Sequence, residues 1–233
     1  MTSVIEPEAG RNAVDLLAAA RIVFWDFDGV IKDSVAAKSD GFEKLFRPFG
    51  AEVARRVRQH HEAHGGVSRY EKIPLYLGWV GESATEARIQ EFCGRFSNLV
   101  LQAVIDSPWV PGVREYLRKQ CDRQRFVLLT ATPQEEILQI LQTLDIAACF
   151  HAVHGAPASK AVALRDTLRT LGCSADQAVM VGDSEADLHA AEENRVLLLL
   201  RRTAINRSLQ RRYPGPMFED LAAATRVADS FPR

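Results

Sequence analysis

The sequence contains few cysteines and none of the spacings that would make them structural. Its four cysteines lie far apart and form no CxxC pair. This excludes the usual zinc-ligand spacing and disfavours a disulfide framework in a chain of this length. We therefore expect Cys93, Cys121, Cys149 and Cys173 to be reduced thiols.

Long apolar runs are also missing. No stretch approaches the roughly 18 apolar residues that are needed to span a bilayer. The nearest approach to a signal sequence, Leu16 to Trp25, is split by Arg21 and flanked by Asp15 and Asp26, which is wrong for a secretory h-region. We expect a cytoplasmic protein without a membrane partner.

The chain has no large charge of one sign, since 29 Lys and Arg residues nearly balance 30 Asp and Glu residues. A net charge near zero gives no global attraction to nucleic acid, so no nucleic-acid partner is expected. The one basic stretch contains Arg201, Arg202, Arg207, Arg211 and Arg212. Such a run is more typical of a solvated surface or an oligomer contact than of a polyanion site, and we expect a monomer or homodimer.

Four short apolar runs predict buried strands. They are residues 22–25, 126–129, 178–181 and 196–200. Continuous apolar runs of this length are typical of strands that are covered on both faces. Helical patterns over 134–144 and 161–171 lie between the runs, and this alternation predicts an α/β fold with a doubly wound, Rossmann-like parallel sheet.

The interval between the first and second predicted strands is far longer than one crossover needs. It has helical patterns over 41–64, 68–78 and 83–105, and Pro108 and Pro111 mark its end. We predict an all-helical cap subdomain, residues 34–108, inserted after the first strand. The α/β catalytic core would then consist of residues 1–33 and 109–233.

Polar clusters follow the predicted strands. They are Asp26-Phe27-Asp28-Gly29-Val30, Thr130-Ala131-Thr132 and Gly182-Asp183-Ser184-Glu185-Ala186-Asp187, and Lys160 opens the helix before the third strand. Each alone is typical of a turn or a helix cap. In open α/β sheets, however, ligands bind beyond the carboxyl ends of the strands. Several carboxylates on one rim repel one another unless a cation lies among them, and oxygen ligands suit Mg²⁺.

Together these segments resemble the four ordered motifs of the haloacid dehalogenase superfamily, over residues 22–200. The string from Asp26 to Ser34 is similar to the branch that contains β-phosphoglucomutase and phosphoglycolate phosphatase. In that branch a helical cap is inserted between the first and second motifs, where the long helical interval falls here.

The resemblance implies a phosphoric monoester hydrolase in which Asp26 is the nucleophile and forms an aspartyl-phosphate. It also implies that Mg²⁺ is held by Asp26, Asp183 and the backbone carbonyl of Asp28, with Asp187 in support. A metal of this kind offsets the charge of the carboxylate and the phosphate.

The same resemblance makes Asp28 the general acid and base, with Thr130 and Lys160 binding the phosphoryl oxygens beside backbone N–H groups at Gly29 and Ala131. Dehalogenases and phosphonatases of the superfamily lack an acid at the second position, so Asp28 favours phosphate esters. Ala131 departs from the family pattern, because many relatives carry asparagine there.

The segment Gly66-Val67-Ser68-Arg69 resembles the cap specificity loop of β-phosphoglucomutase. We expect Arg69, and also Lys72, to reach an anionic or polyhydroxylated part of the substrate; the alternative is a solvated helix. His60 and His64 are one helical turn apart, but no third metal ligand is evident beside them and His61.

The sequence thus favours a Mg²⁺-dependent phosphatase acting on a small phosphorylated metabolite, with a sugar phosphate as the leading substrate. The alternative is a phosphomutase, in which phospho-Asp26 returns its group to another hydroxyl of a bound sugar. A non-catalytic binding protein is disfavoured because every catalytic position is filled.

Overall fold

The centre of the fold is a six-stranded parallel sheet in the strand order β3-β2-β1-β4-β5-β6. The computed structural model describes residues 12–222. The strands are β1 (Ile22–Trp25), β2 (Arg125–Pro133), β3 (Phe150–Ala156), β4 (Ala178–Gly182), β5 (Leu197–Arg201) and β6 (Met217–Phe218). The doubly wound α/β architecture expected from the sequence is confirmed.

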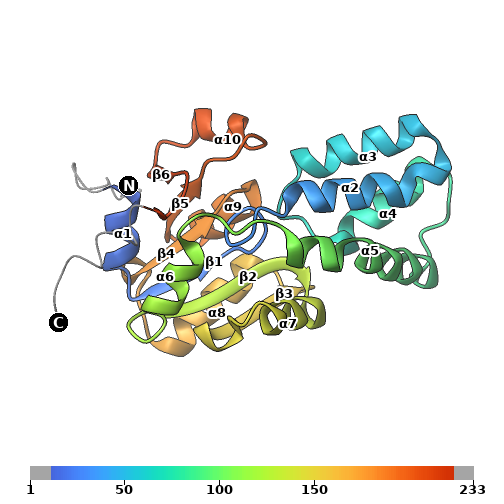
Figure 1. Cartoon of the computed structure of the whole chain (residues 1–233). Helices are drawn as coiled ribbons and strands as arrows, with labels where there is room; N and C mark the ends of the chain where they lie inside the picture. The colour runs from blue at the N-terminus through green and yellow to red at the C-terminus, as the bar shows by residue number, and fades with distance from the viewer. Residues whose placement is uncertain (1–11, 223–233) are drawn as a thin grey trace.

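Helices cover both faces of this sheet (Figure 1). The helices outside the long insertion are α1 (Ala13–Ala19), α6 (Val113–Gln120), α7 (Gln134–Thr143), α8 (Lys160–Leu171), α9 (Glu185–Glu193) and α10 (Arg207–Arg212), with short 3-10 helices η2 (Ala147–Cys149) and η3 (Ala175–Gln177). Val23 and Trp25 pack toward α1, α6 and α7, whereas Ile22 and Phe24 pack toward α8 and α9. This alternation explains why β1 reads as a continuous apolar run.

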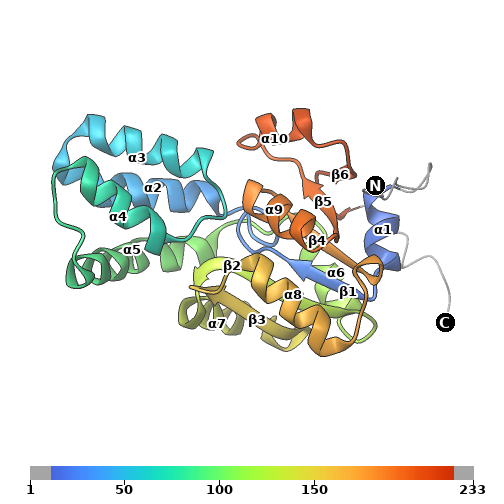
Figure 2. The same cartoon turned by 180° about the vertical axis from the view of Figure 1, so that it is seen from behind.

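Between β1 and α6 the chain forms a group of helices that gather to one side of the sheet (Figures 1 and 2). They are α2 (Val35–Phe46), the 3-10 helix η1 (Arg47–Phe49), α3 (Ala51–Ala63), α4 (Arg69–Trp79) and α5 (Glu86–Asp106). We call α2–α5 the cap. The boundaries drawn from the sequence stay a prediction, and the ends of the predicted core lie partly outside the described residues.

The prediction of one helix in the cap is wrong in its length. The pattern over 41–64 was expected to form a single helix, but the chain leaves it at η1 and re-enters a helix at Ala51. Pro48 lies inside η1, and Gly50 adopts a φ of 111°. Proline lacks the N–H that a continuing helix requires, and only glycine adopts such a backbone readily.

The cap has an aromatic core of its own. Phe42 lies against Phe96 with ring centroids 4.0 Å apart, and Phe46 contacts Tyr76 and Phe92 at 5.5 and 5.4 Å. All five rings are buried. Aromatic contacts of this kind bury large areas, so the cap helices hold one another in place and present a firm wall to the sheet.

No helix within residues 12–222 is long and apolar enough to cross a membrane.

The close packing of α2 on α5 depends on a glycine. A Cβ built on Gly41 would lie 2.2 Å from Val100 Cγ1, whereas one on Gly94 of α5 would meet nothing within 4 Å. We predict that Gly41→Ala lowers the free energy of unfolding by about 1–3 kcal/mol through overpacking. Gly94→Ala should instead raise it, by up to about 1 kcal/mol, because alanine favours the helix. Urea denaturation of both variants measures this, and equal stabilisation by the two substitutions would contradict it.

Candidate active site

Asp26 follows β1 directly and occupies the point where the strand order reverses between β1 and β4. Its backbone N–H donates to the Val181 carbonyl at 2.9 Å. Its carboxylate Oδ1 accepts from the Phe27 N–H at 2.7 Å and lies 2.8 Å from Lys160 Nζ. Crevices at such switch points are the usual ligand sites of open α/β sheets.

The environment of Asp26 opposes its ionisation. Burial, followed by the negative charge of Asp187, raises the pKa of Asp26 to about 7, against the opposing effect of Lys160. The carboxylate would therefore be fully ionised at neutral pH only with more positive charge beside it.

Lys160 supplies part of that charge. Its Nζ contacts Asp26 Oδ1 at 2.8 Å and Asp187 Oδ1 at 2.7 Å. Burial alone would lower the pKa of Lys160, but the two carboxylates hold it above its ordinary value. Because Lys160 is the first residue of α8, the start of that helix places the ammonium between two acidic groups.

Asp187 holds the turn after β4. Its Oδ2 accepts hydrogen bonds from the N–H groups of Asp183 and Ser184, at 3.2 and 3.0 Å, and from Ser184 Oγ at 2.6 Å. Because its Oδ1 is engaged by Lys160, Asp187 shapes the site mainly by orienting its neighbours.

The carboxylates fit a divalent cation. Asp26, Asp183 and Asp187 each offer an oxygen, and these atoms lie within 4.8 Å of one another. Burial, and then the charges of Asp26 and Asp187, raise the pKa of Asp183 well above its ordinary value. Gly29 makes room for Asp183, because a Cβ there would lie 2.1 Å from Asp183 Oδ2. A hard cation with oxygen ligands would relieve this repulsion.

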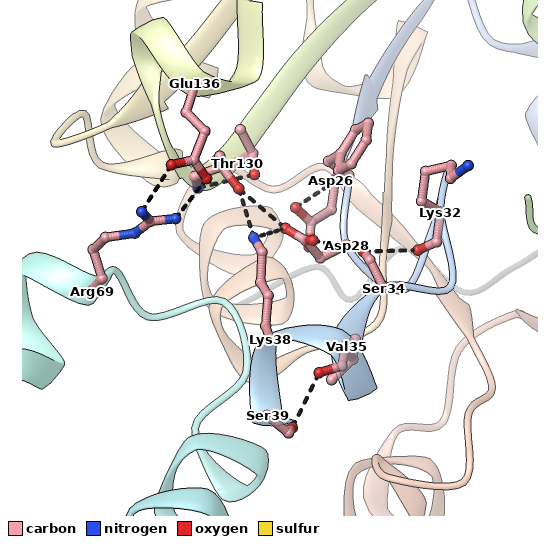
Figure 3. Close-up of polar contacts among 12 residues, drawn as sticks. Asp26, Asp28, Lys32, Ser34, Val35, Lys38, Ser39, Arg69, Thr130 and Glu136 are labelled. Carbon is pink, nitrogen blue, oxygen red and sulfur yellow. Dashed lines mark hydrogen bonds and ion pairs between the residues drawn. The ribbon is translucent and has the colours of Figure 1, made fainter. Parts of the chain in front are cut away.

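Asp28 lies in a network of three side chains, drawn in Figure 3. Ser34 Oγ donates to its Oδ1 at 2.7 Å, while Lys38 Nζ and Thr132 Oγ1 both donate to its Oδ2. Burial would raise the pKa of Asp28, but the charge and hydrogen bond of Lys38, helped by Ser34 and Thr132, hold it below its ordinary value. Asp28 is thus kept as a carboxylate.

Sequence reasoning missed Lys38. It lies on α2 and is buried, and its Nζ also donates to Thr132 Oγ1 at 2.7 Å. A lysine on a helix is typical of a solvated face, so nothing in its own neighbourhood marks it. The one available signal is its spacing, because Lys38 lies four residues after Ser34, one helical turn into the helix that follows the Asp28 segment.

The predicted phosphate-binding residues lie beside these groups. Thr130 is buried and its Oγ1 accepts from the Thr132 N–H at 3.2 Å. Ala131 lines a cleft with Asp26, Asp28 and Asp183, and Thr130 lines an adjoining hollow with Lys160. The structure therefore brings Thr130, Ala131 and Lys160 to one rim, as expected from their places along the chain.

The cleft lies between the cap and the sheet and encloses about 120 Å³. Cap residues, among them Lys38, Phe42 and His61, form one wall, and the segment 203–209 after β5 contributes to the other. Gly66 brings the cap down onto α9, since a Cβ there would lie 2.5 Å from Ser184 Oγ.

The environment predicted for Arg201 from the sequence is wrong. It was expected within a solvated or oligomer-contacting basic stretch, but it is buried and donates to the Gly29 carbonyl at 2.7 Å and the Glu219 carbonyl at 3.1 Å. Its position at the end of β5 brings it back under the loop that follows Asp26. The other arginines of the stretch, Arg202, Arg207, Arg211 and Arg212, are exposed.

Arg69 is buried and lines the cleft. Its guanidinium forms a bidentate ion pair with the Glu136 carboxylate of α7, with N–O distances of 2.9 and 2.7 Å. It also donates to Ser97 Oγ at 2.6 Å. This pair joins the cap to the core (Figure 3). The alternative of a solvated helix is wrong for this residue.

Lys72 is also buried, and its Nζ lies 3.0 Å from Nδ1 of His61. The other two histidines of the segment point elsewhere: His60 and His64 stack with ring centroids 3.9 Å apart, and His60 Nδ1 contacts the Tyr76 hydroxyl at 3.0 Å. Burial, and then the charge of Lys38, lower the pKa of Lys72 to about 7.

A sequence model of the haloacid dehalogenase-like hydrolase family matches residues 23–199. The chain belongs to this family, which confirms the resemblance drawn from its motifs and the expectation of a hydrolase of this type. No curated protein matches the chain in sequence.

Solved structures of the same fold match nearly the whole chain. A predicted phosphoglycolate phosphatase from Haemophilus somnus is 17% identical, with 90% of this chain and 98% of that chain covered and a TM-score of 0.69. A β-phosphoglucomutase from Clostridium difficile is 16% identical, with 88% and 92% covered and a TM-score of 0.70. CbbY from Rhodobacter sphaeroides, solved with phosphate, is 15% identical, with 87% and 95% covered and a TM-score of 0.69. At these identities the matches establish the fold.

The lowered pKa of Lys72 predicts a pH-dependent cost in stability. The unfolded chain keeps Lys72 protonated up to its ordinary pKa of 10.5, whereas the folded protein favours loss of the proton above about pH 7. The destabilisation is therefore complete below about pH 7 and fades as the pH rises toward 10.5.

We predict that Lys72→Met raises the free energy of unfolding near pH 7 by about 1–4 kcal/mol, an advantage that shrinks toward pH 10. Denaturant unfolding at several pH values measures this. The groups that act on Lys72 are His61, Lys38, Glu71 and Asp28. Lys44→Met, at an exposed position of α2, is the control and should show no such trend; a destabilised Lys72→Met protein would contradict the prediction.

Proposed function

We propose that this haloacid dehalogenase-like hydrolase is a magnesium-dependent phosphatase of small phosphorylated metabolites that works through a phosphorylated Asp26. The observation that carries the proposal is one buried carboxylate, Asp26, which contacts Lys160 and belongs to a group of three acids that fits a cation. A second carboxylate, Asp28, is held separately on the same loop.

Asp26, Asp183 and the backbone carbonyl of Asp28 would hold the ion, and Asp187 would keep Asp183 in place through its hydrogen bond to the Asp183 N–H. Magnesium bound there supplies positive charge that lowers the pKa of Asp26 and offsets the phosphate's own charge.

The protein's own groups then position the reaction. Lys160 orients the Asp26 carboxylate for attack on phosphorus, and the leaving-group oxygen departs as the bond from Asp26 to phosphorus forms. Thr130 and Lys160 bind the non-bridging oxygens, together with the backbone N–H of Ala131. The Gly29 N–H, which the sequence also suggested for this role, instead donates to the Lys32 carbonyl at 2.7 Å. This chemistry is mainly positioning plus stabilisation of charge.

Asp28 serves both proton transfers in this proposal. It gives a proton to the leaving oxygen and later takes one from the water that hydrolyses phospho-Asp26. Lys38 favours the carboxylate form of Asp28, which is the form that activates water. Delivery of a proton therefore requires the contact between Lys38 and Asp28 to weaken when substrate is bound.

The substrate is proposed to be a small phosphate ester, with a sugar phosphate as the leading candidate. One solved relative of the fold, CbbY, was captured with xylulose-(1,5)bisphosphate, a sugar with two phosphates. In this chain Lys38, His61 and Arg69 line the cleft beyond the reacting carboxylates, so hydrogen-bond donors face the leaving group.

A phosphomutase is the second candidate. Two contacts close the cap on the core, Gly66 against Ser184 and Arg69 against Glu136, and such closure would shield phospho-Asp26 from water. Dependence of turnover on a sugar bisphosphate activator would favour this reading.

Asp26→Asn should abolish metal-dependent phosphate release. We expect a loss of more than about a thousandfold in kcat, because the nucleophile is removed while the fold is kept. The measurement is phosphate release from a panel of sugar and other metabolite phosphates, with magnesium and with chelator. Release that persists in the variant or in chelator would contradict the mechanism, and a wild-type protein inactive on every ester, with and without bisphosphate activators, would contradict catalysis.

Arg69 and Glu136 allow the two roles of that ion pair to be separated. If Arg69 contacts the substrate, Arg69→Ala should raise KM by about tenfold or more, while Glu136→Gln should raise it far less. If the pair acts only as a link between cap and core, the two variants should change KM and kcat alike. An unchanged KM in Arg69→Ala would rule out the substrate contact.

A further inference from the structure

Lys72 differs from the other buried cations of the cap in lacking an acidic partner. Lys38 pairs with Asp28 and Arg69 pairs with Glu136. Lys72 is only 2% exposed, and within residues 12–222 its polar contact is with His61 Nδ1. No carboxylate of the described residues forms an ion pair with it. Its charge is therefore poorly compensated, and an unpaired buried charge is costly.

The contact with Lys72 fixes the state of His61. Below about pH 7, where Lys72 keeps its proton, the ammonium carries only donors, so Nδ1 of His61 accepts and the imidazole proton resides on Nε2. The ring stays neutral, because burial and then the charge of Lys72 hold the pKa of His61 well below its ordinary value. His61 thus offers one N–H donor of fixed tautomer.

The side chain that carries this donor, His61, borders the cleft. His61 lines the cleft and Lys72 does not, so of this contacting pair the imidazole is the side chain that borders the space for substrate. The ring is packed against Phe42, with centroids 4.7 Å apart. Lys38 borders the same space, while the charge of Arg69 is already matched by Glu136.

A purely structural role does not account for this arrangement. An apolar side chain in place of Lys72 would fill the same volume without the cost of burying a charge. Costly groups of this kind are commonly kept where function needs them. An anion in the cleft would supply the missing partner.

We propose that His61 and Lys72 form a subsite for a second anionic group, a carboxylate or a phosphate, on the leaving group of the substrate. His61 contacts the anion through Nε2–H, and Lys72 is a positioning residue that acts through it. This inference rests on the proposed phosphatase function, and it assigns the recognition of the second anion to His61.

The test compares substrates within each protein preparation. The ratio of kcat/KM for phosphoglycolate, whose leaving group carries a carboxylate, to kcat/KM for 2-hydroxyethyl phosphate, whose leaving group is neutral, measures recognition of the second charge. Glucose 1,6-bisphosphate against glucose 1-phosphate gives the same ratio for a phosphate. Because both rates come from one preparation, the ratio does not depend on the folded fraction.

We expect His61→Leu and Lys72→Met to lower the larger of the two wild-type ratios by at least about tenfold, the scale of a lost hydrogen bond to a charged group. His61→Gln, which can place an amide N–H near the position of Nε2, should restore part of it. His60→Leu is the matched control, because His60 does not line the cleft. Wild-type ratios near one, or equal loss in the control, would overturn the subsite.

Binding separates this inference from the proposed function. Titration calorimetry of the Asp26→Asn protein with the two members of the preferred substrate pair needs no turnover. Tighter binding of the doubly anionic member that is lost on adding His61→Leu supports the subsite even if no ester is hydrolysed. Equal binding of both members would overturn it even if the wild-type protein is an active phosphatase.

Discussion

Repulsion among buried carboxylates is the constraint on which the arrangement of this site depends. Three acids share a space in which their oxygens lie within 4.8 Å of one another, and such a group cannot stay ionised without positive charge nearby. The fold gathers that charge from separate elements: Lys160 comes from the start of α8 and Arg201 from the end of β5. The doubly wound topology matters because it delivers these distant residues to one rim, next to the place where a divalent cation fits.

The sequence predicted the parts of the fold that carry their own signal. β1, β4 and β5 are continuous apolar runs because they lie inside the sheet, and they were found nearly to the residue. β3 was missed, since this edge strand includes exposed His151 and the half-buried His154 and shows no apolar run. β6 has two residues and gives no periodic signal. The patterns report burial, so elements that are only partly buried escape them.

The same division holds for the site. Four site residues could be proposed because each comes just after a predicted apolar strand: Asp26, Asp28, Thr130 and Asp183. Lys38, Arg201 and Glu136 could not, because each is a charged residue on a helix or at the end of an edge-proximal strand, where charge is usually solvated. Lys38 and Glu136 become paired only where the cap and the core meet, and Arg201 only where β5 returns beneath the loop after Asp26. No local pattern records these contacts. Arg69 was singled out by resemblance and Lys72 by its place on the same helix face, but neither signal pointed to their partners Glu136 and His61.

In the proposed mechanism, the hydrogen bonds of Asp28 also link proton transfer to movement of the cap. Two of its three side-chain partners, Ser34 and Lys38, belong to the first turns of α2, whereas Thr132 belongs to the sheet. Any swing of α2 that admitted a substrate would carry two of those partners away from the carboxylate. If Asp28 activates water as proposed, it is held in place for that step only while the cap lies closed on the core.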